Sequence, residues 1–426
     1  MSDSFIQFAN SFQSIARLGL ESIENLLSQL GNPQNDLSFI HIAGTNGKGS
    51  VCAFLQNIFT HAGYRTGKYT SPNLISVCER ISIDGENISE DDLHEVMSIV
   101  ENGAKKTIAE LGDSPTQFEL WTAAAFCYFK KQDCDIVILE TGLGGTQDAT
   151  NIIPPPLASV ITRIDLDHTE YLGNTLADVA SQKAGIIKKP LSDHKTGLTI
   201  SAPQYPEAEK VLQAVCNEQN NRLIISDTPN SQGTNGCHEL FSYKGIENMC
   251  CGIAGYHQLE NAAIAIETAL ALGISSEHIK YGIEAASNPA RFEILQENPL
   301  VIYDGAHNRN GMHSLAASLK RYFPSWTGAT FITAFMGDKD IDGVFEELET
   351  SGLSKNSQLY AVKVKDNPRA AEATTVCDIA KKHGFSSISF GSIKAAYENA
   401  ISQNKLVVIC GSLYLYKDLK EEISHI

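Results

Sequence analysis

A glycine-rich stretch with a single lysine is the part of this sequence best suited to bind a phosphate group. A short apolar run at 39–43 is followed directly by GTNGKGS at 44–50. Glycine permits tight turns that point backbone N–H groups inward, and the positive N-terminal end of a following helix attracts an anion. Lys48 would then neutralise a β- or γ-phosphate. Gly49 separates Lys48 from Ser50, so the spacing is not the common P-loop, and a turn without a ligand is the alternative.

The carboxylate of Glu140 is a second group that could do chemistry. It ends the apolar run 135–139 and precedes a glycine-rich segment at 141–145. Such a run is typical of a buried parallel strand, and ligands bind at the carboxyl ends of these strands. Beside a phosphate-binding loop, Glu140 is suited to bind Mg²⁺ directly or through water. A salt bridge or a helix cap is the alternative.

His168 and Lys183 are ambiguous from their own surroundings. His168 follows the apolar run 157–162 within the acidic segment DLDHTE, where a histidine is more often a structural residue than a metal ligand. Lys183 lies in a helical pattern, and exposure to solvent is its simplest interpretation.

Alternating strands and helices would position these residues. Strands are predicted at 39–43, 64–70, 135–139 and 157–162, and helices at 19–27, 51–62, 116–130 and 258–272. The βαβ order predicts a parallel sheet. Further strands at 300–303, 330–335, 358–362 and 406–410 predict a second, smaller α/β domain. Residues 190–250 look polar and irregular after a strand at 198–201, and we expect no function there.

The composition of the chain disfavours some binding partners and indicates a cellular compartment. The 426 residues suggest two or three domains, and 50 acidic against 33 basic side chains give a net charge of −17, which disfavours nucleic acid. Ten cysteines without a C-x-x-C pair indicate a reducing cytoplasm. Acidic Asp3 with no apolar signal region, and no apolar run of eighteen residues, predict neither export nor a membrane span.

Ordered motifs over nearly the whole chain resemble the folylpolyglutamate and dihydrofolate synthases within the Mur ligase group. They lie at 19–34, 44–50, 69–72, 118–119, 140–151, 166–173, 183–188, 257–261, 291–293, 304–308, 366–369 and 411–415. The resemblance implies a two-domain α/β fold. Residues 1–295 would form a P-loop-type, parallel-sheet central domain that binds ATP and a pterin, and 296–426 a smaller Rossmann-like glutamate-ligase domain.

The resemblance also implies roles for individual residues. ATP would be bound by Gly44, Thr45, Asn46, Gly47, Lys48, Gly49, Ser50, Asn261, Arg291 and Asp304. Two magnesium ions would be bound by Ser71, Glu140, His168 and, once its amine is carbamylated, Lys183. Substrate contacts would come from Phe118, Glu119, Asp148, His307 and Ser412, and catalytic roles from Lys48, His168, Lys183, Asp304 and His307.

The implied reaction joins L-glutamate to dihydropteroate, to the glutamate tail of tetrahydrofolate, or to both. ATP would phosphorylate a carboxylate, and the amine of glutamate would displace phosphate from the acyl phosphate. A Mur-type ligase for another acid, such as a cell-wall precursor, and a nucleotide-binding protein without ligase activity are the alternatives. We expect a cytoplasmic monomer with small-molecule substrates and no nucleic acid or membrane partner.

Two residues depart from the family pattern. Thr146 stands where relatives commonly have arginine next to the pterin-side pocket, and loss of that fork-shaped cation predicts a change in which folate or pteroate is bound. Ala290 stands where glycine is usual before Arg291, which predicts a stiffer hinge.

Overall fold

The computed structural model of the chain describes residues 19–192, 194–325, 328–403 and 405–423, so Asp3 lies outside the described residues. The chain divides into two compact units. The first contains Met1–Asn230, Ser242–Met249 and Glu260–Ala286, and the second contains Ser231–Phe241, Cys250–Leu259 and Ser287–Ile426. The predicted domain boundary between 295 and 296 stays a prediction. None of the helices in the described ranges combines the length and apolar character that a bilayer crossing requires.

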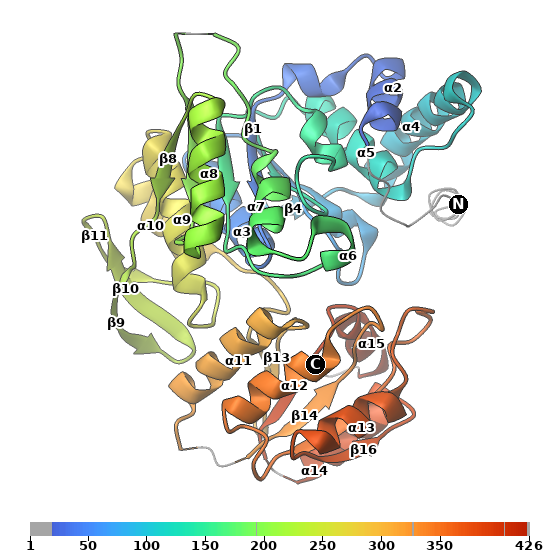
Figure 1. Cartoon of the computed structure of the whole chain (residues 1–426), viewed down its shortest axis with the longest axis vertical. Helices are drawn as coiled ribbons and strands as arrows, with labels where there is room; N and C mark the ends of the chain where they lie inside the picture. Colours follow the sequence, from blue (N-terminus) through green and yellow to red (C-terminus); the bar gives the residue numbers. More distant parts are fainter. Residues whose placement is uncertain (1–18, 193, 326–327, 404, 424–426) are drawn as a thin grey trace. The chain divides into compact units, whose positions relative to one another are not determined.

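The first unit is built on an eight-stranded sheet with the order β4-β3-β2-β5-β1-β6-β7-β8. Figure 1 labels its strands β1, β4 and β8. Six strands are parallel: β1 (Phe39–Ala43), β2 (Thr66–Tyr69), β5 (Ile136–Glu140), β6 (Ala158–Ile161), β7 (Gly197–Ser201) and β8 (Asn221–Ile225). The strands β3 (Ile81–Ile83) and β4 (Glu86–Asn87) extend one edge in antiparallel fashion. The predicted parallel sheet is confirmed, and the carboxyl ends of β2, β5, β1 and β6 are neighbours at one edge.

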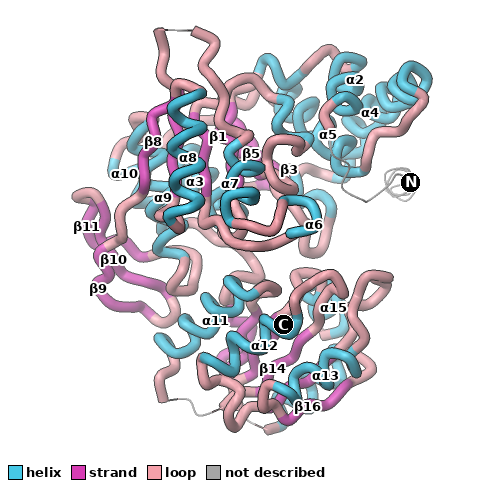
Figure 2. Tube along the Cα trace, in the orientation of Figure 1, coloured by secondary structure: helices cyan, strands magenta, loops and turns pink. Residues whose placement is uncertain are grey.

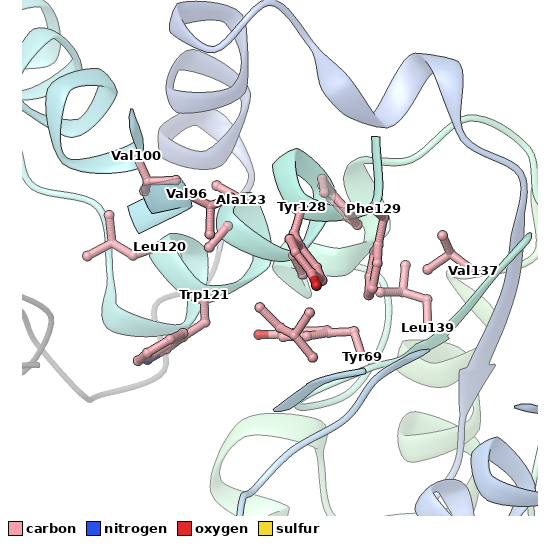
Figure 3. Close-up of a cluster of buried hydrophobic side chains, with 14 of the residues drawn as sticks. Tyr69, Val96, Val100, Leu120, Trp121, Ala123, Tyr128, Phe129, Val137 and Leu139 are labelled. Carbon is pink, nitrogen blue, oxygen red and sulfur yellow. The ribbon is translucent and has the colours of Figure 1, made fainter. Parts of the chain in front are cut away.

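Helices cover both faces of this sheet. On one face α3 (Lys48–His61) packs on β1, β2 and β5 and against α10 (Ser276–Ala285), the helix that follows α9 (Gln258–Ala271). On the other face, α2 (Glu21–Gln29), α4 (Glu90–Leu111) and α5 (Gln117–Lys131) enclose an apolar core with Tyr69, Val137 and Leu139 (Figure 3). A neighbouring core on that face is formed with α7 (Leu176–Ala184) and α8 (Pro206–Glu218). The short helices are η1 (Pro33–Asp36), η2 (Val77–Arg80), η3 (Ala149–Ile152) and α6 (Thr169–Leu172).

The second unit contains a six-stranded sheet with the order β12-β13-β17-β14-β15-β16. Its strands are β12 (Glu293–Glu297), β13 (Leu300–Tyr303), β14 (Thr330–Thr333), β15 (Gln358–Ala361), β16 (Ser386–Ser389) and β17 (Val407–Cys410). All but β12 are parallel. The helices are α11 (Arg309–Tyr322), α12 (Ile341–Thr350), α13 (Ala373–Lys382), α14 (Ile393–Ser402) and α15 (Leu415–Glu422). The predicted second α/β domain is therefore confirmed.

The prediction that residues 190–250 are irregular is wrong. This stretch contains α8 and β8, followed by a three-stranded sheet of β9 (Asn230–Asn235), β10 (His238–Tyr243) and β11 (Ile246–Cys250), which Figure 2 shows as separate strands. Every residue of β9 is exposed, so its sequence lacks the alternation of apolar residues that marks a half-buried strand. Backbone pairing with β10 forms the strand instead.

Candidate active site

The predicted phosphate-binding loop joins β1 to α3. Gly44 and Gly47 have positive φ angles of 153° and 87°, which side-chain-bearing residues rarely adopt. The helix begins at Lys48, three residues earlier than the sequence suggested, so Lys48, Gly49 and Ser50 form its first turn. The first turn of a helix leaves backbone N–H groups without intrahelical partners, which is the geometry that binds an anion.

Neighbouring elements fix the shape of this loop. A Cβ on Gly44 would lie 1.7 Å from Thr162 Oγ1, and one on Gly47 would lie 2.2 Å from Asn261 Oδ1, so only glycine fits at either position. The Thr162 hydroxyl donates to Asn46 O at 2.6 Å. The Thr45 hydroxyl donates to Asp165 O at 2.9 Å. The loop is therefore held by the segment after β6 and by α9, which brings Asn261 to it as the resemblance implied.

Lys48 is folded over the loop that precedes it. Its half-buried side chain donates from Nζ to Gly44 O at 3.2 Å and to Thr45 O at 3.3 Å. These two bonds hold the ammonium group of Lys48 beside the backbone of the predicted phosphate-binding loop.

Glu140 and Ser71 lie side by side because β5 and β2 are neighbours and both strands end at this edge. The Ser71 N–H donates to Glu140 Oε2 at 3.2 Å, and Glu140 is buried. A carboxylate and a hydroxyl fit Mg²⁺, which prefers oxygen ligands. The described residues contain no group of three or more His, Cys, Asp or Glu side chains that could hold a metal. Mg²⁺ is usually bound by only one or two protein side chains, because water and phosphate oxygens supply its other ligands.

Lys183 is buried, so its interpretation as a solvent-exposed helix lysine is wrong. It lies on the face of α7 that also buries Val179 and Ala180, and its Nζ donates to Gly44 O at 2.8 Å. Burial, and then the positive charge of Lys48, lower the pKa of Lys183 to about 7, although Asp167 and Asp148 oppose the shift. A substantial share of the amine is neutral near pH 7, and a neutral amine is what carbamylation by carbon dioxide requires.

His168 lies in the segment that follows β6, at the same edge of the sheet. It precedes α6 with a positive φ of 51°, and its side chain is 40% exposed. Its Nε2 lies 3.9 Å from Asp167 Oδ1. A metal role for His168 stays a prediction.

Two of the residues implied in substrate contact within this unit, Phe118 and Asp148, contact the loop after β5. The Phe118 ring packs against Gly142, where a Cβ would lie 2.6 Å from it. Glu119 caps α5, since its Oε2 accepts the Thr116 N–H at 2.6 Å. Asp148 is buried, and its carboxylate accepts the N–H groups of Leu143 at 2.7 Å and Thr150 at 3.0 Å. Burial raises the pKa of Asp148.

A separate group of predicted residues forms within the second unit, where β13 and β17 end side by side. Asp304 is buried and accepts the N–H groups of Phe292 at 2.9 Å and Ala306 at 2.8 Å. Burial raises the pKa of Asp304, and Arg291 opposes the shift. His307 Nδ1 lies 2.8 Å from Gly305 O, and the buried Ser412 accepts the Tyr303 hydroxyl at its backbone oxygen at 2.7 Å. Arg291, Asp304, His307 and Ser412 thus belong to one region.

Ala290 lies in a backbone conformation that favours glycine, the residue that the resemblance predicts there. Ala290 has a φ of 60° and Phe292 a φ of 47°, so the chain adopts the left-handed conformation twice around Arg291. A residue with a Cβ pays roughly 1–2 kcal/mol in that conformation. The segment is held in place by the bond from the Phe292 N–H to Asp304.

The sequence reasoning did not single out His41, Thr150 or Thr162. Thr162 braces the phosphate-binding loop, and His41 and Thr150 are buried and bonded to each other. The only signal was a histidine inside an otherwise apolar strand, which has to find a hydrogen-bond partner when it is buried.

Comparisons with known proteins identify the family to which the chain is similar. The model of the Mur ligase middle domain matches residues 42–269, and that of the Mur ligase glutamate ligase domain matches 290–413. The chain is 33% identical to the dihydrofolate synthase/folylpolyglutamate synthase of Bacillus subtilis, with 95% of each chain covered. It is 30% identical to the folylpolyglutamate synthase of Lacticaseibacillus casei, with 98% of this chain and 97% of the relative covered.

Two solved structures extend the similarity to three dimensions. Mycobacterium tuberculosis folylpolyglutamate synthase complexed with ADP superposes with a TM-score of 0.91 at 28% identity, and 98% of each chain is covered. Escherichia coli FolC in complex with DHPP and ADP gives a TM-score of 0.86 at 29% identity, with 99% of this chain and 97% of that chain covered.

Proposed function

This chain belongs to the folylpolyglutamate and dihydrofolate synthase branch of the Mur ligase family, and we propose that, as an ATP-dependent ligase of folate metabolism, it attaches L-glutamate to dihydropteroate, to the glutamate tail of tetrahydrofolate, or to both. The substrate class in this proposal is that of the relatives, and the residues assigned to each step are those of the candidate active site.

The observation that carries the proposal is the convergence of four strand ends at one edge of the first sheet. β2 brings Ser71, β5 brings Glu140, β1 brings the loop with Lys48, and the segment after β6 braces that loop. Ligands of parallel α/β sheets bind at such an edge. An anion-binding helix terminus, a lysine and a buried carboxylate together match the needs of a nucleoside triphosphate.

The chain's own residues favour the first chemical step by position and charge. A carboxylate is a poor electrophile, and transfer of the γ-phosphoryl group converts it to an acyl phosphate. Lys48 and the first N–H groups of α3 stabilise the negative charge that spreads over the transferred group. The acid must lie in line with the triphosphate, and the loop after β5 is the surface beside Glu140 that can hold it.

Magnesium is assigned to Ser71 and Glu140, with His168 and carbamylated Lys183 completing the proposed set for two ions. When bound, the metal would neutralise charge on the phosphate oxygens. The low pKa of Lys183 supports the modification, because the amine is neutral often enough to react.

The residues of the second unit are proposed to bind glutamate, with Arg291 and Asp304 also proposed to contact nucleotide. Arg291 offers a fixed fork of donors that suits a carboxylate or phosphate. His307 lies in the loop between β13 and α11. Asp304 would attract an ammonium group, although its carboxylate is already engaged with two backbone N–H groups.

The direct test is release of ADP and phosphate by the purified protein. Release should require a pterin acid and L-glutamate together, and the product should gain one glutamate by mass spectrometry. ADP release that ignores glutamate would contradict the ligase assignment. A panel of dihydropteroate, tetrahydrofolate and nucleotide-linked peptide precursors at fixed glutamate would identify the acid.

The cysteines and the net charge of the chain support proposals for its cellular location and its binding partners. All ten cysteines are free, which supports a cytoplasmic location. We propose a monomer that binds neither nucleic acid nor membrane, because the net charge of −17 repels anionic surfaces. Light scattering at working concentration checks the monomer.

A further inference from the structure

A buried chain of hydrogen bonds runs from the strand of the phosphate-binding loop to the loop after β5. His41 lies on β1, three residues before Gly44, and its side chain is fully buried. His41 Nε2 lies 2.8 Å from Thr150 Oγ1, and the Thr150 hydroxyl donates to Asp148 Oδ1 at 2.5 Å. Three polar side chains from two separate segments are thereby joined inside the first unit.

The bonds determine which ring nitrogen of His41 carries hydrogen. A hydroxyl has one proton, and that of Thr150 is used in its bond to Asp148, so the Thr150 oxygen accepts from His41 Nε2–H. Nδ1 is the unprotonated nitrogen, and it has no hydrogen-bond partner among the described residues. Burial, and then the charge of Lys188, lower the pKa of His41 to about 3, so the ring is neutral at physiological pH.

Asp148 also bonds to the other end of the loop 142–148, so the chain of hydrogen bonds from His41 extends into this loop. Its second oxygen accepts the Leu143 N–H at 2.7 Å, which closes the loop on itself. The loop in turn packs on α7, because the Thr146 N–H donates to Gln182 O at 2.8 Å. A Cβ on Gly145 would lie 3.1 Å from Lys183 Cα, which shows how close the two backbones are.

The contacts then return to the point where they began. Lys183 Nζ donates to Gly44 O, at the end of the strand that carries His41. A closed ring therefore runs from β1 through Thr150 and Asp148 to the loop 142–148, on to α7, and back to the phosphate-binding loop. Removing the bond between His41 and Thr150 opens this ring and leaves only its path through α7 and Lys183.

We propose that His41 and Thr150 are positioning residues that hold the loop 142–148 and the Lys183 backbone in register with the phosphate-binding loop. The inference rests on the proposed function, since it takes the acid substrate to lie against this loop. Displacement of a reacting group by about 1 Å can cost roughly 100-fold in rate. ATP binding should be spared, because the bond from Thr162 to Asn46 O holds the phosphate-binding loop independently of His41 and Thr150.

The kinetic test uses matched variants in the full-length protein. Thr150→Val and His41→Leu remove the bonds at nearly constant volume, whereas Thr150→Ser keeps the hydroxyl and His41→Gln keeps an N–H donor. We expect the first pair to lower kcat/KM for the pterin acid about tenfold or more, with KM for ATP changed less than about twofold. Thr150→Ser and His41→Gln should retain most of the wild-type kcat/KM for the pterin acid. Thr199→Val, a buried threonine on β7 bonded to Asn221, is the control and should behave as wild type.

A readout that needs no substrate separates this inference from the proposed function. Thr150→Val should accelerate hydrogen exchange of the Leu143 amide about tenfold or more over the Thr199→Val control, and the ¹⁵N spectrum of wild-type His41 should show hydrogen on Nε2. Wild-type exchange and kinetics in Thr150→Val, equal effects in the control, or hydrogen on Nδ1 would overturn the proposal. A protein inactive toward every pterin acid, yet with accelerated exchange at Leu143, would refute the proposed substrate and still support the positional role.

Discussion

The edges of the two parallel sheets use buried charged groups in different ways. At the first edge, Lys48 and Lys183 make bonds to carbonyl groups, and Glu140 accepts the N–H of Ser71. At the second edge, the Asp304 carboxylate holds two backbone N–H groups across a segment with left-handed residues. In our proposal the first edge directs Lys48 toward a ligand, whereas the second edge uses the Asp304 carboxylate to hold a strained backbone. Variants at the two edges should differ accordingly, with activity lost at the first and stability lost at the second.

The largest effect is expected for Lys48→Ala at the first edge. Loss of a charged donor that stabilises the transferred phosphoryl group should lower kcat about 10²–10³-fold. The fold should persist, because the side chain is only half-buried in the first turn of α3. Steady-state kinetics and circular dichroism check both points, with the exposed Lys210→Ala as control. Unchanged turnover would remove Lys48 from the mechanism.

Lys183→Met should affect activity and also the pH dependence of stability. The folded pKa of Lys183 is about 7 and the model-compound value is 10.5, so the unfolded chain binds more protons between these pH values. Stability should therefore rise with pH across this window, by up to a few kcal/mol, and the rise should be smaller in Lys183→Met. Urea unfolding at pH 7, 8.5 and 10 measures it. Equal slopes in the two proteins would contradict the burial argument.

The same lysine offers a chemical test of its modification. In Lys183→Ala, small carboxylates such as acetate should restore part of the lost activity, because they replace the oxygen donors of a carbamate. Chloride at the same ionic strength is the control. Absence of any rescue would count against carbamylation.

Asp304→Asn should lower stability more than Glu140→Gln does. An amide group at Asp304 presents N–H where a backbone N–H of Phe292 or Ala306 requires an acceptor, at a cost of about 1–3 kcal/mol. The amide oxygen of glutamine can retain the bond that Glu140 accepts from the Ser71 N–H. Denaturant unfolding compares the variants. A larger loss in Glu140→Gln would reverse the contrast between the edges.

The smallest effect, and the only gain, is expected for Ala290→Gly. Glycine relieves the left-handed conformation, whereas its greater freedom in the unfolded chain and the loss of a buried methyl group offset part of the benefit, so the free energy of unfolding should increase by at most about 0.5 kcal/mol. Ala286→Gly is the matched control, because Ala286 is buried with a φ of −67° and should lose stability on the same change. Destabilisation by Ala290→Gly would show that the residue is not strained.

Local pattern was sufficient to predict most elements of both sheets. Apolar runs that are buried on both faces, such as 136–139 and 407–410, stand out in the sequence, and their order predicts parallel pairing. That order also predicted that Glu140 lies beside the glycine loop, whereas Ser71 was implied only by the family resemblance. The exposed strand β9 and the short edge strands could not be found in this way, since backbone pairing rather than apolar side chains forms them.

The sequence could not show how individual polar groups are used. Lys183 looks like a surface lysine because helical spacing does not reveal which face of α7 meets the sheet. Glu119 and Asp148 match family positions, yet much of their bonding capacity serves a helix cap and a loop. His41 and Thr150 are 109 residues apart, and only the parallel register of β1 and β5 brings their segments together.

The contact between Gly47 and Asn261 has a consequence for biosynthesis. The phosphate-binding loop with Gly47 is synthesised early. Asn261, which packs against Gly47, lies on α9, more than two hundred positions later in the chain. Nucleotide affinity should therefore appear only once translation has passed α9 and that helix has docked. A nascent or truncated chain ending at residue 250 should not retain ATP, whereas one ending at 286 contains every segment of the first unit.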